Sequence, residues 1–342
     1  MTTRDSDGKT FEAEDVALQS GALLDKAVIA YRTYGRLSEA KDNLVLFPTW
    51  FSSQLRQNEW LIGEGRPLDP RRHFIVSVGL LGNGQSSSPS NTPGRSAGPA
   101  FPPVSLLDNV LLQHRLLAQE WGIERIALVI GRSMGAQIAF QWGARFPDMV
   151  ARMLPFSGSA KTTPHNYVFL DGVKAALTAD QDWMNGSYTQ PPLGGLRAIG
   201  RLYAGWALSP AYYRKNLHLA EGDSTLDGYL RRRWEGNFLA KDANDLLCQL
   251  GTWQRADISD NDVYKKDWPK ALRSIKARAI VMPCRSDMFF PPEDSAAAVA
   301  HMPNAELRII ESDWGHRAAA ANSDPADIAF LEAAIRELLE TR

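Results

Sequence analysis

The sequence predicts an α/β protein with a mostly parallel central sheet flanked by helices and an inserted helical cap. Three observations predict this class. Short apolar runs without strict alternation are typical of strands buried on both faces of a parallel sheet. A helical pattern separates two of these runs, which gives the strand–helix–strand order of such a sheet. The strand pattern stops near residue 161 and returns after residue 275, which indicates one sheet interrupted by a different segment.

Five apolar runs bounded by turn residues are the predicted strands. They are 43–47 (NLVLF), 73–78 (HFIVSV), 125–130 (RIALVI), 278–282 (RAIVM) and 306–310 (ELRII). Between the second and the third run, residues 105–122 carry leucines and a valine near helical spacing, which predicts a helix.

Residues 161–271 form the predicted helical cap. This segment is richer in Trp, Tyr and charge than the flanking sequence, and its clearest patterns are helical fragments at 195–206 and 225–234. The predicted α/β core domain then consists of residues 1–160 and 272–342. The alternative is one continuous domain with long helices, but the similar strand pattern on both sides favours an insertion.

The composition excludes several classes of partner. The chain has 342 residues, and its 38 Lys and Arg against 39 Asp and Glu give no reason to expect nucleic acid or an anionic membrane as partner. Its first residues lack the basic start and apolar block of a signal peptide, and no apolar run reaches the about 18 residues of a membrane span. No residues have metal-ligand spacing. We therefore expect a cytoplasmic protein without metal or organic cofactor.

Residues 131–135 (GRSMG) match the motif G-x-S-x-G and lie between a strand pattern and a helix pattern. A sharp strand-to-helix turn crowds the backbone and therefore needs small residues on both sides of the serine. Such a turn presents the hydroxyl of Ser133 above the sheet, and the following helix points its N-terminus at a developing oxyanion. The alternative is a chance match in a Gly-rich loop, but the strand–turn–helix context favours a nucleophile.

A serine nucleophile needs a base and an acid that orients the base, which follow such a turn in the order serine, acid, histidine. His316 lies in the loop after the last predicted strand and is the expected base, whereas His301 ends an Ala-rich helical stretch. Asp287 follows the strand at 278–282 and is the expected acid. The alternative acid, Asp313, lies so close to His316 in sequence that one short loop leaves little room for a hydrogen bond to Nδ1.

An oxyanion hole requires two backbone N–H donors. One is expected from Met134, the residue after the nucleophile, and the other from Trp50 in the loop after the first apolar run. An aromatic residue at position 50 is equally compatible with ordinary wall packing, since only its backbone is required.

Four segments together resemble the homoserine O-acetyltransferase family of α/β-hydrolases. They are 31–37 (YRTYGRL), 77–92 (SVGLLGNGQSSSPSNT), 131–148 (GRSMGAQIAFQWGARFPD) and 286–316 (SDMFFPPED…GH). The resemblance extends over nearly the whole chain and implies the α/β-hydrolase fold, with an acyl-enzyme on Ser133 and a triad completed by Asp287 and His316. It also implies a helical cap that forms a tunnel to the serine, and a homodimer packed through the caps.

Two departures from the family transferases lie beside the expected reaction centre. Residues 48–52 are PTWFS where the transferases carry a loop close to HALTG, and 317–320 are RAAA where they commonly have Asp followed by Phe-Leu. Residues 203–216 and 242–259 resemble an esterase-like subgroup of the family. The resemblance therefore predicts a serine esterase for short-chain acyl (acetyl) esters. The alternatives are a homoserine O-acetyltransferase that uses acetyl-CoA and L-homoserine, and an inert binding protein of the same fold.

Substrate-binding residues are expected on both sides of the tunnel. A homoserine carboxylate requires an arginine over the serine, and Arg201 and Arg214 in the cap are the candidates; ion pairs within the cap are the alternative. A small apolar acyl pocket requires aromatic walls, although core packing is an alternative role for each candidate. The aromatic candidates are Trp50, Phe51, Trp183, Trp206 and Phe290.

Overall fold

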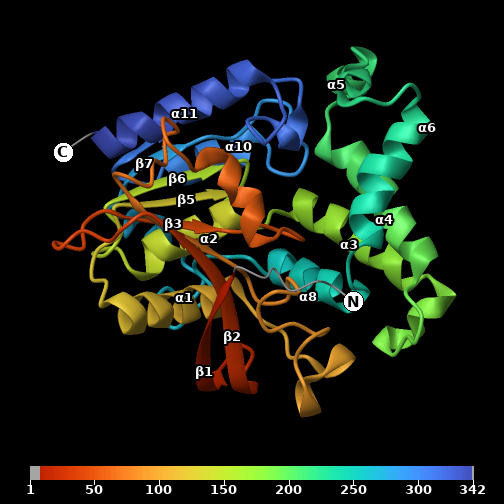
Figure 1. Cartoon of the computed structure of the whole chain (residues 1–342), viewed down its shortest axis with the longest axis horizontal. Helices are drawn as coiled ribbons and strands as arrows, with labels where there is room; N and C mark the ends of the chain where they lie inside the picture. Colours follow the sequence, from red (N-terminus) through yellow and green to blue (C-terminus); the bar gives the residue numbers. More distant parts are fainter. Residues whose placement is uncertain (1–7, 341–342) are drawn as a thin grey trace.

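An eight-stranded sheet runs through the centre of the computed structural model, which describes residues 8–340 (Figure 1). The strands are β1 (Lys9–Ala17), β2 (Leu23–Tyr34), β3 (Leu44–Pro48), β4 (Phe74–Val78), β5 (Leu128–Arg132), β6 (Arg152–Phe156), β7 (Arg278–Val281) and β8 (Ala305–Leu307). Their order is β1-β2-β4-β3-β5-β6-β7-β8. The pairs β1–β2 and β2–β4 are antiparallel and all other pairs are parallel, so the predicted fold class is confirmed.

Each of the five predicted apolar runs overlaps a strand, but the three strands β1, β2 and β6 were not predicted. In β1 the buried residues are separated by exposed ones, so this strand has no continuous apolar run. Strand β2 does contain a continuous apolar run, 27–31 (AVIAY), which was not among the predicted strands. Strand β6 contains Pro155, which cannot donate to a ladder and therefore weakens the strand pattern. Reliance on uninterrupted apolar runs therefore explains why β1 and β6 were not predicted, but it does not explain the omission of β2.

Helices cover both faces of the sheet and fill the segment between β6 and β7 (Figure 1). The α-helices are α1 (Leu106–Trp121), α2 (Met134–Arg145), α3 (Pro164–Thr178), α4 (Leu193–Ala207), α5 (Pro210–Arg214), α6 (Leu226–Tyr229), α7 (Gly236–Leu239), α8 (Ala243–Gln254), α9 (Trp268–Arg273), α10 (Pro292–Val299) and α11 (Pro325–Glu340). The short 3₁₀ turns are η1 (Leu55–Leu61), η2 (Gly94–Ser96), η3 (Gly98–Ala100), η4 (Gln181–Gly186), η5 (Leu217–Glu221) and η7 (Gly315–Arg317), and η6 (Leu230–Glu235) is a π-helical turn.

Strand β3 shows why the central strands read as continuous apolar runs. Leu44 and Leu46 belong to the cluster that contains the buried side of α1 and α2, whereas Val45 and Phe47 belong to the cluster under α11. Successive side chains of a strand point to opposite faces, and both faces are covered by helices here. The strand therefore needs an apolar residue at every position.

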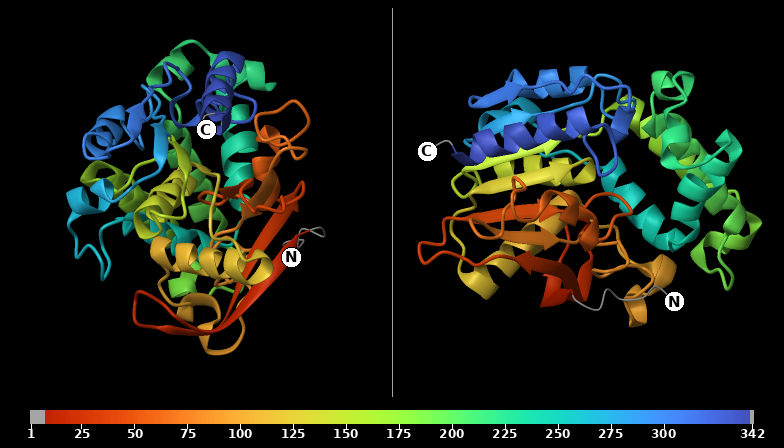
Figure 2. Two further views of the ribbon diagram at one scale, coloured as in Figure 1. Left: turned by 90° about the vertical axis from the view of Figure 1, so that its left-hand side faces the viewer. Right: turned by 45° about the horizontal axis from the view of Figure 1, so that its top comes forward.

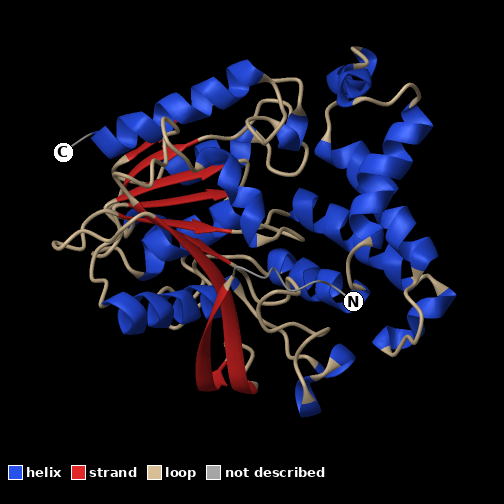
Figure 3. Ribbon diagram, in the orientation of Figure 1, coloured by secondary structure: helices blue, strands red, loops and turns tan. Residues whose placement is uncertain are grey.

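Helices α3 to α8, which lie between β6 and β7 in the chain, gather at the end of the sheet where the parallel strands finish (Figure 2). Figure 3 shows only helix and loop across residues 161–271, all of which the structure describes. The predicted helical fragment at 195–206 lies within α4, and the fragment at 225–234 lies in the continuous run of α6 and η6. The predicted boundary at residue 271 falls inside α9, and residues 1–7 of the predicted core, with the predicted lack of a leader, lie outside the described residues.

None of the helices in the described range is both long and apolar enough to cross a membrane.

Candidate active site

A sharp turn between β5 and α2 presents Ser133. The residue has φ 55° and ψ −125°, a conformation that is strained for any residue with a Cβ atom. A Cβ atom at Gly131 would lie 2.0 Å from the carbonyl oxygen of Gly135, so only glycine permits this tight turn. The N–H of Ser133 donates to the carbonyl of Phe156 on β6 at 3.0 Å, which holds the turn against the neighbouring strand. The motif thus lies in the strand–turn–helix context that the sequence predicts.

Three side chains from separate loops form one hydrogen-bonded chain. Oγ of Ser133 lies 2.9 Å from Nε2 of His316, and Nδ1 of His316 lies 2.8 Å from Oδ2 of Asp287. With the ring proton on Nδ1, the hydroxyl donates to the imidazole and the imidazole donates to the carboxylate. The three residues follow β5, β8 and β7, so the carboxyl ends of parallel strands bring them together at one edge of the sheet.

The loop of Asp287 fixes the orientation of its carboxylate. Oδ1 accepts hydrogen bonds from the N–H of Phe289 at 2.8 Å and of Phe290 at 3.2 Å, which leaves Oδ2 for His316. Phe289 also lies edge-on to the imidazole with 4.8 Å between ring centroids. The acid and its two neighbours therefore hold the imidazole from two directions.

The alternative base and acid lie elsewhere. Asp313 pairs with Lys215 of the cap. His301 packs edge-on against Trp268, with 5.9 Å between ring centroids. Neither side chain takes part in the hydrogen-bonded chain at Ser133.

His316 lies in an environment suited to a neutral imidazole. Burial lowers the pKa of His316 below the ordinary value of 6.5, and this effect outweighs the opposite effect of Asp287. The positive charge of Arg132 lowers the pKa further. At neutral pH the ring is therefore unprotonated and can accept the proton of Ser133.

Of the two backbone N–H groups expected to bind an oxyanion, that of Met134 is free to do so and that of Trp50 is not. Met134 is the first residue of α2, where a backbone N–H has no partner within the helix. The N–H of Trp50 donates to Oγ of Ser53 at 2.8 Å, and that hydroxyl donates back to the carbonyl of Trp50 at 2.9 Å. The Trp50 donor is therefore already engaged, which corrects the expectation that it stands free for an oxyanion.

A cavity of about 370 Å³ opens onto Ser133 and His316. Aromatic side chains from the β3 loop and the cap form its apolar wall: Trp50, Phe51, Tyr203, Trp234, Phe238 and Trp253. Phe51 stacks on Tyr203 with 5.6 Å between ring centroids, which joins the core loop to α4. Phe290 lies behind this wall, stacked on Trp253 and close to His316, so it supports the cavity without lining it. Of the aromatic residues predicted to line an acyl pocket, Trp50 and Phe51 therefore line this cavity, whereas Trp183, Trp206 and Phe290 do not.

Arg201 and Arg214, the expected carboxylate-binding residues, do not line the cavity. Arg201 pairs with Glu235 at 2.6 Å and with Asp227 at 2.9 Å, which is the cap-internal role weighed as the alternative. Arg214 is exposed near the end of the short helix α5. The expectation that Arg201 and Arg214 bind a carboxylate at Ser133 is therefore corrected, because neither residue lines the cavity.

Other arginines line the cavity instead, and none of them was among the predicted binding residues. Arg132 precedes the serine and Arg317 follows the histidine, so adjacency to the two motifs was a usable signal for both. Arg233 comes from the π-helical turn η6, and nothing in its sequence context indicates the cavity.

A second, larger cavity of about 760 Å³ lies between the β1–β2 hairpin, the loop at 82–93 and α8. Its buried Asp245 accepts hydrogen bonds from the N–H and the hydroxyl of Ser90 at 2.9 and 2.6 Å, and burial raises the pKa of Asp245 to about 7. Among its described lining residues there is no histidine to activate a hydroxyl. Within residues 8–340, no group of three or more His, Cys, Asp or Glu side chains is arranged to hold a metal ion.

Comparisons with known proteins agree with this geometry. Residues 43–319 match the sequence model of a family described as the alpha/beta hydrolase fold. An ethyl acetate hydrolase from Pseudomonas veronii is 36% identical over 331 residues, which cover 95% of this chain and 93% of that protein. A homoserine O-acetyltransferase from Trichormus variabilis is 29% identical over 315 residues, which cover 88% of this chain and 86% of that protein.

A solved structure of an ester hydrolase is also similar to this chain. An acetylester hydrolase from Corynebacterium glutamicum superposes with a TM-score of 0.94 at 35% identity, covering 98% of this chain and 96% of that chain. These two hydrolases are more similar to the chain than the acetyltransferase is. The resemblance inferred from the sequence motifs, including the esterase-like subgroup, is confirmed.

Proposed function

This chain belongs to the alpha/beta hydrolase fold family, and from that premise we propose that it is a serine esterase for short-chain acyl esters. Acetyl esters are the proposed substrates, because the relatives with the highest identity described above are an ethyl acetate hydrolase and an acetylester hydrolase. In this proposal Ser133 is the nucleophile, His316 the base and Asp287 the residue that orients the base.

The proposed reaction has two halves. His316 removes the proton of Ser133 while Oγ forms a bond to the acyl carbon, and the carbonyl oxygen takes up the negative charge. The N–H of Met134 and the N-terminus of α2 face this charge. The bond to the alcohol oxygen then breaks, and His316 passes its proton to the leaving alcohol. In the second half, His316 takes a proton from water while the water oxygen attacks the acyl carbon. The bond between that carbon and Oγ of Ser133 then breaks, and His316 returns the proton to Oγ as the carboxylic acid leaves.

The hydrogen-bonded chain from Ser133 through His316 to Asp287 carries the proposal. Its two hydrogen bonds, Ser133 Oγ to His316 Nε2 and His316 Nδ1 to Asp287 Oδ2, are 2.9 and 2.8 Å long. The three residues are almost completely buried, at the floor of a cavity with an aromatic wall. A serine in a chance Gly-rich turn needs neither partner. The small size of the cavity and its aromatic wall support a short acyl group over a long one.

Hydrolysis of p-nitrophenyl acetate and ethyl acetate by the purified protein tests the proposal. We expect burst release of p-nitrophenol, covalent labelling of Ser133 by a fluorophosphonate, and loss of both in Ser133→Ala. Absence of ester hydrolysis together with absence of labelling would instead favour an inert binding protein of the same fold.

Homoserine O-acetyltransferase is the second candidate, favoured by the 29% identity over most of the chain. It shares the first half-reaction and differs in the acceptor, which is the hydroxyl of homoserine instead of water. Release of thiol from acetyl-CoA, measured with and without L-homoserine on the same batch of protein, separates the two. Homoserine-dependent thiol release without ester hydrolysis would replace the esterase proposal.

The proposal also covers the organisation of the chain. We propose that residues 161–271 act as a cap over the core formed by 1–160 and 272–342, with α9 at the boundary, and that two chains pair through their caps. Apolar side chains exposed on α3 and α4 support this pairing, among them Val168 at 66% exposure.

A further inference from the structure

Apart from His316, the described acidic and basic residues that line the cavity at Ser133 are all arginines. Its described lining residues include no Asp or Glu, and they include four arginines: Arg56, Arg132, Arg233 and Arg317. A neutral ester such as ethyl acetate requires no such arrangement, because cations placed in a small cavity lose hydration that a neutral ligand cannot replace. The arginines therefore bear on the kind of ester that the site binds.

Arg132 is a buried cation without a carboxylate partner among the described residues. Its side chain is only 8% exposed, and Nη2 donates to the carbonyl oxygen of His316 at 2.6 Å. Its guanidinium lies 5.4 Å from the ring centroid of Trp50, and its buried Nε has no hydrogen-bond acceptor. Burial lowers the pKa of Arg132 to about 10, so the group is still charged at neutral pH.

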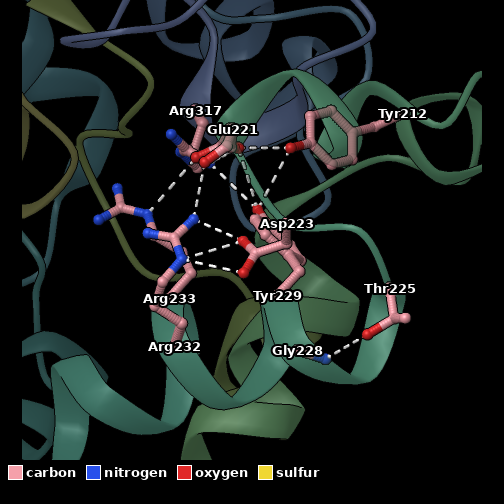
Figure 4. Close-up of polar contacts among 9 residues, drawn as sticks. All are labelled: Tyr212, Glu221, Asp223, Thr225, Gly228, Tyr229, Arg232, Arg233 and Arg317. Atoms are coloured by element: carbon pink, nitrogen blue, oxygen red, sulfur yellow. Dashed lines mark hydrogen bonds and ion pairs between the residues drawn. The ribbon is translucent and has the colours of Figure 1, made fainter.

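Arg233 and Arg317 share a single carboxylate. Nη1 of Arg317 lies 2.6 Å from Oε1 of Glu221, whereas Nε of Arg233 reaches Oε2 only at 3.8 Å (Figure 4). Oε1 also accepts a hydrogen bond from Tyr212. The neighbouring Arg232 faces Asp223 and forms a separate pair (Figure 4). Of the three arginines Arg232, Arg233 and Arg317, Arg233 therefore has the longest distance to its carboxylate partner, and its side chain remains 45% exposed.

The balance of charge around the cavity is positive. Apart from the exposed Arg56, the guanidinium groups of the lining are those of Arg132, Arg233 and Arg317, and two carboxylates lie behind the wall. Glu221 is bound by Arg317 and Tyr212, and Asp287 is bound by His316 and two backbone N–H groups. Glu221 is shared between Arg317 and, at a longer distance, Arg233, so two carboxylates face three cations and the net charge beside the cavity is positive.

We propose that the preferred substrates are short acyl esters that carry a carboxylate, and that Arg233 binds that carboxylate. This inference rests on the proposed esterase function and names its substrate class. A guanidinium matches a carboxylate with two parallel hydrogen bonds, and Arg233 has free donors directed to the cavity. Such an ester supplies the missing negative charge, while the bonds made and broken at Ser133 remain those of ordinary ester hydrolysis.

Pairs of esters that differ only in charge test the inference. Acetoxyacetate and its neutral amide place the charge on the alcohol side, and monomethyl succinate and its amide place it on the acyl side. We expect kcat/KM for the anionic member of at least one pair to exceed that of its amide by about tenfold or more, as a charge-assisted hydrogen bond allows. The pair that shows the preference identifies the side that carries the carboxylate.

Variants then assign the preference to one residue. Arg233→Gln should reduce the anionic-to-neutral ratio of kcat/KM by about tenfold, and Arg233→Lys should retain part of it. Arg231→Gln is the matched control, because Arg231 lies on the same π-helical turn but pairs with Asp227 outside the cavity. Its ratio should equal that of the wild type.

Two results would overturn the inference. The first is that the wild type hydrolyses the ester bond of both neutral compounds as fast as, or faster than, that of their anionic partners. The second is that Arg233→Gln leaves the anionic-to-neutral ratio of kcat/KM unchanged. Failure of the esterase proposal looks different, since p-nitrophenyl acetate would then not be hydrolysed at all. Activity on p-nitrophenyl acetate without a preference for anionic esters would reject the substrate class alone.

Discussion

Ser133 combines a reactive position with a strained backbone, and the two can be separated by mutation. Both Ser133→Ala and Ser133→Gly remove the nucleophile, and we expect kcat to fall by about 10⁴ to 10⁶ in each. Glycine adopts φ 55° without a steric cost, whereas alanine keeps the strain. Ser133→Gly should therefore be more stable than Ser133→Ala by about 1 kcal/mol in urea unfolding. Equal stability of the two variants would mean that the turn stores no strain.

The pH dependence of ester hydrolysis should report His316. The base must be neutral, so kcat/KM falls as the pH drops through the pKa of His316, which burial places below 6.5. Arg132→Gln removes a charge that lowers this pKa, so the acidic limb should move to higher pH. Asp287→Asn removes a charge that raises it, so the limb should move to lower pH while kcat falls by about 10⁴. Shifts in the opposite directions, measured from pH–rate profiles, would contradict the assignment.

Sequence reasoning reached the three residues of the hydrogen-bonded chain because each follows a recognisable strand, and chain order then fixes their roles. It did not reach Arg233, because a side chain on a π-helical turn is directed by packing within the cap and not by a local pattern. It selected Arg201 for a binding role on charge alone. The ion pairs of Arg201 with Glu235 and Asp227 depend on tertiary contacts that no motif encodes.

At the scale of elements, the contact between β5 and α2 depends on the absence of a side chain. A Cβ atom at Gly131 would meet the carbonyl oxygen of Gly135 at 2.0 Å, and backbone on both sides cannot yield easily. We expect Gly131→Ala to lower the free energy of unfolding by about 3 kcal/mol or more. Gly205→Ala on α4 is the control: open space surrounds that position, and alanine in a helix should stabilise by about 0.5–1 kcal/mol.

The cap is joined to the catalytic loop by Glu221 of η5 and Arg317 of η7, which are 14% and 7% exposed. Glu221→Gln leaves Arg317 buried without its counter-charge and should cost about 3 kcal/mol in urea unfolding. Glu12→Gln breaks the exposed pair with Lys26 and should cost less than about 1 kcal/mol. Similar costs for the two variants would argue against the cap–core connection.

The same pair should make stability sensitive to acid. Burial raises the pKa of Glu221, but the hydrogen bond and charge of Arg317 outweigh this and hold it below the ordinary value of 4.5. The stabilisation is therefore fully present above pH 4.5 and is lost as the pH falls through the lowered pKa. Glu221→Gln should lack this part of the acid dependence.

At the scale of the whole molecule, the proposed pairing through the caps can be tested by placing one charged side chain on the exposed apolar surface of the cap. Val168 on α3 is 66% exposed, beside exposed Tyr167 and close to α4. Light scattering should show a dimer for the wild type and a monomer for Val168→Asp. Phe330→Asp on α11 serves as the control, because Phe330 is also exposed at 41% but lies on the core, so its dimer should persist. A monomeric wild-type protein in light scattering would contradict the proposed pairing through the caps.

The order of the sheet has a consequence for synthesis on the ribosome. Strands β6 and β7 are hydrogen-bonded neighbours, yet the whole cap lies between them in the chain. At roughly 5–20 residues per second, the roughly 120 intervening residues take several seconds or more to emerge. During that time the edge of β6 has no partner and offers its N–H and C=O groups to any other nascent strand. We therefore expect chaperone supply during translation to set the yield of soluble protein more strongly than the stability of the finished fold does.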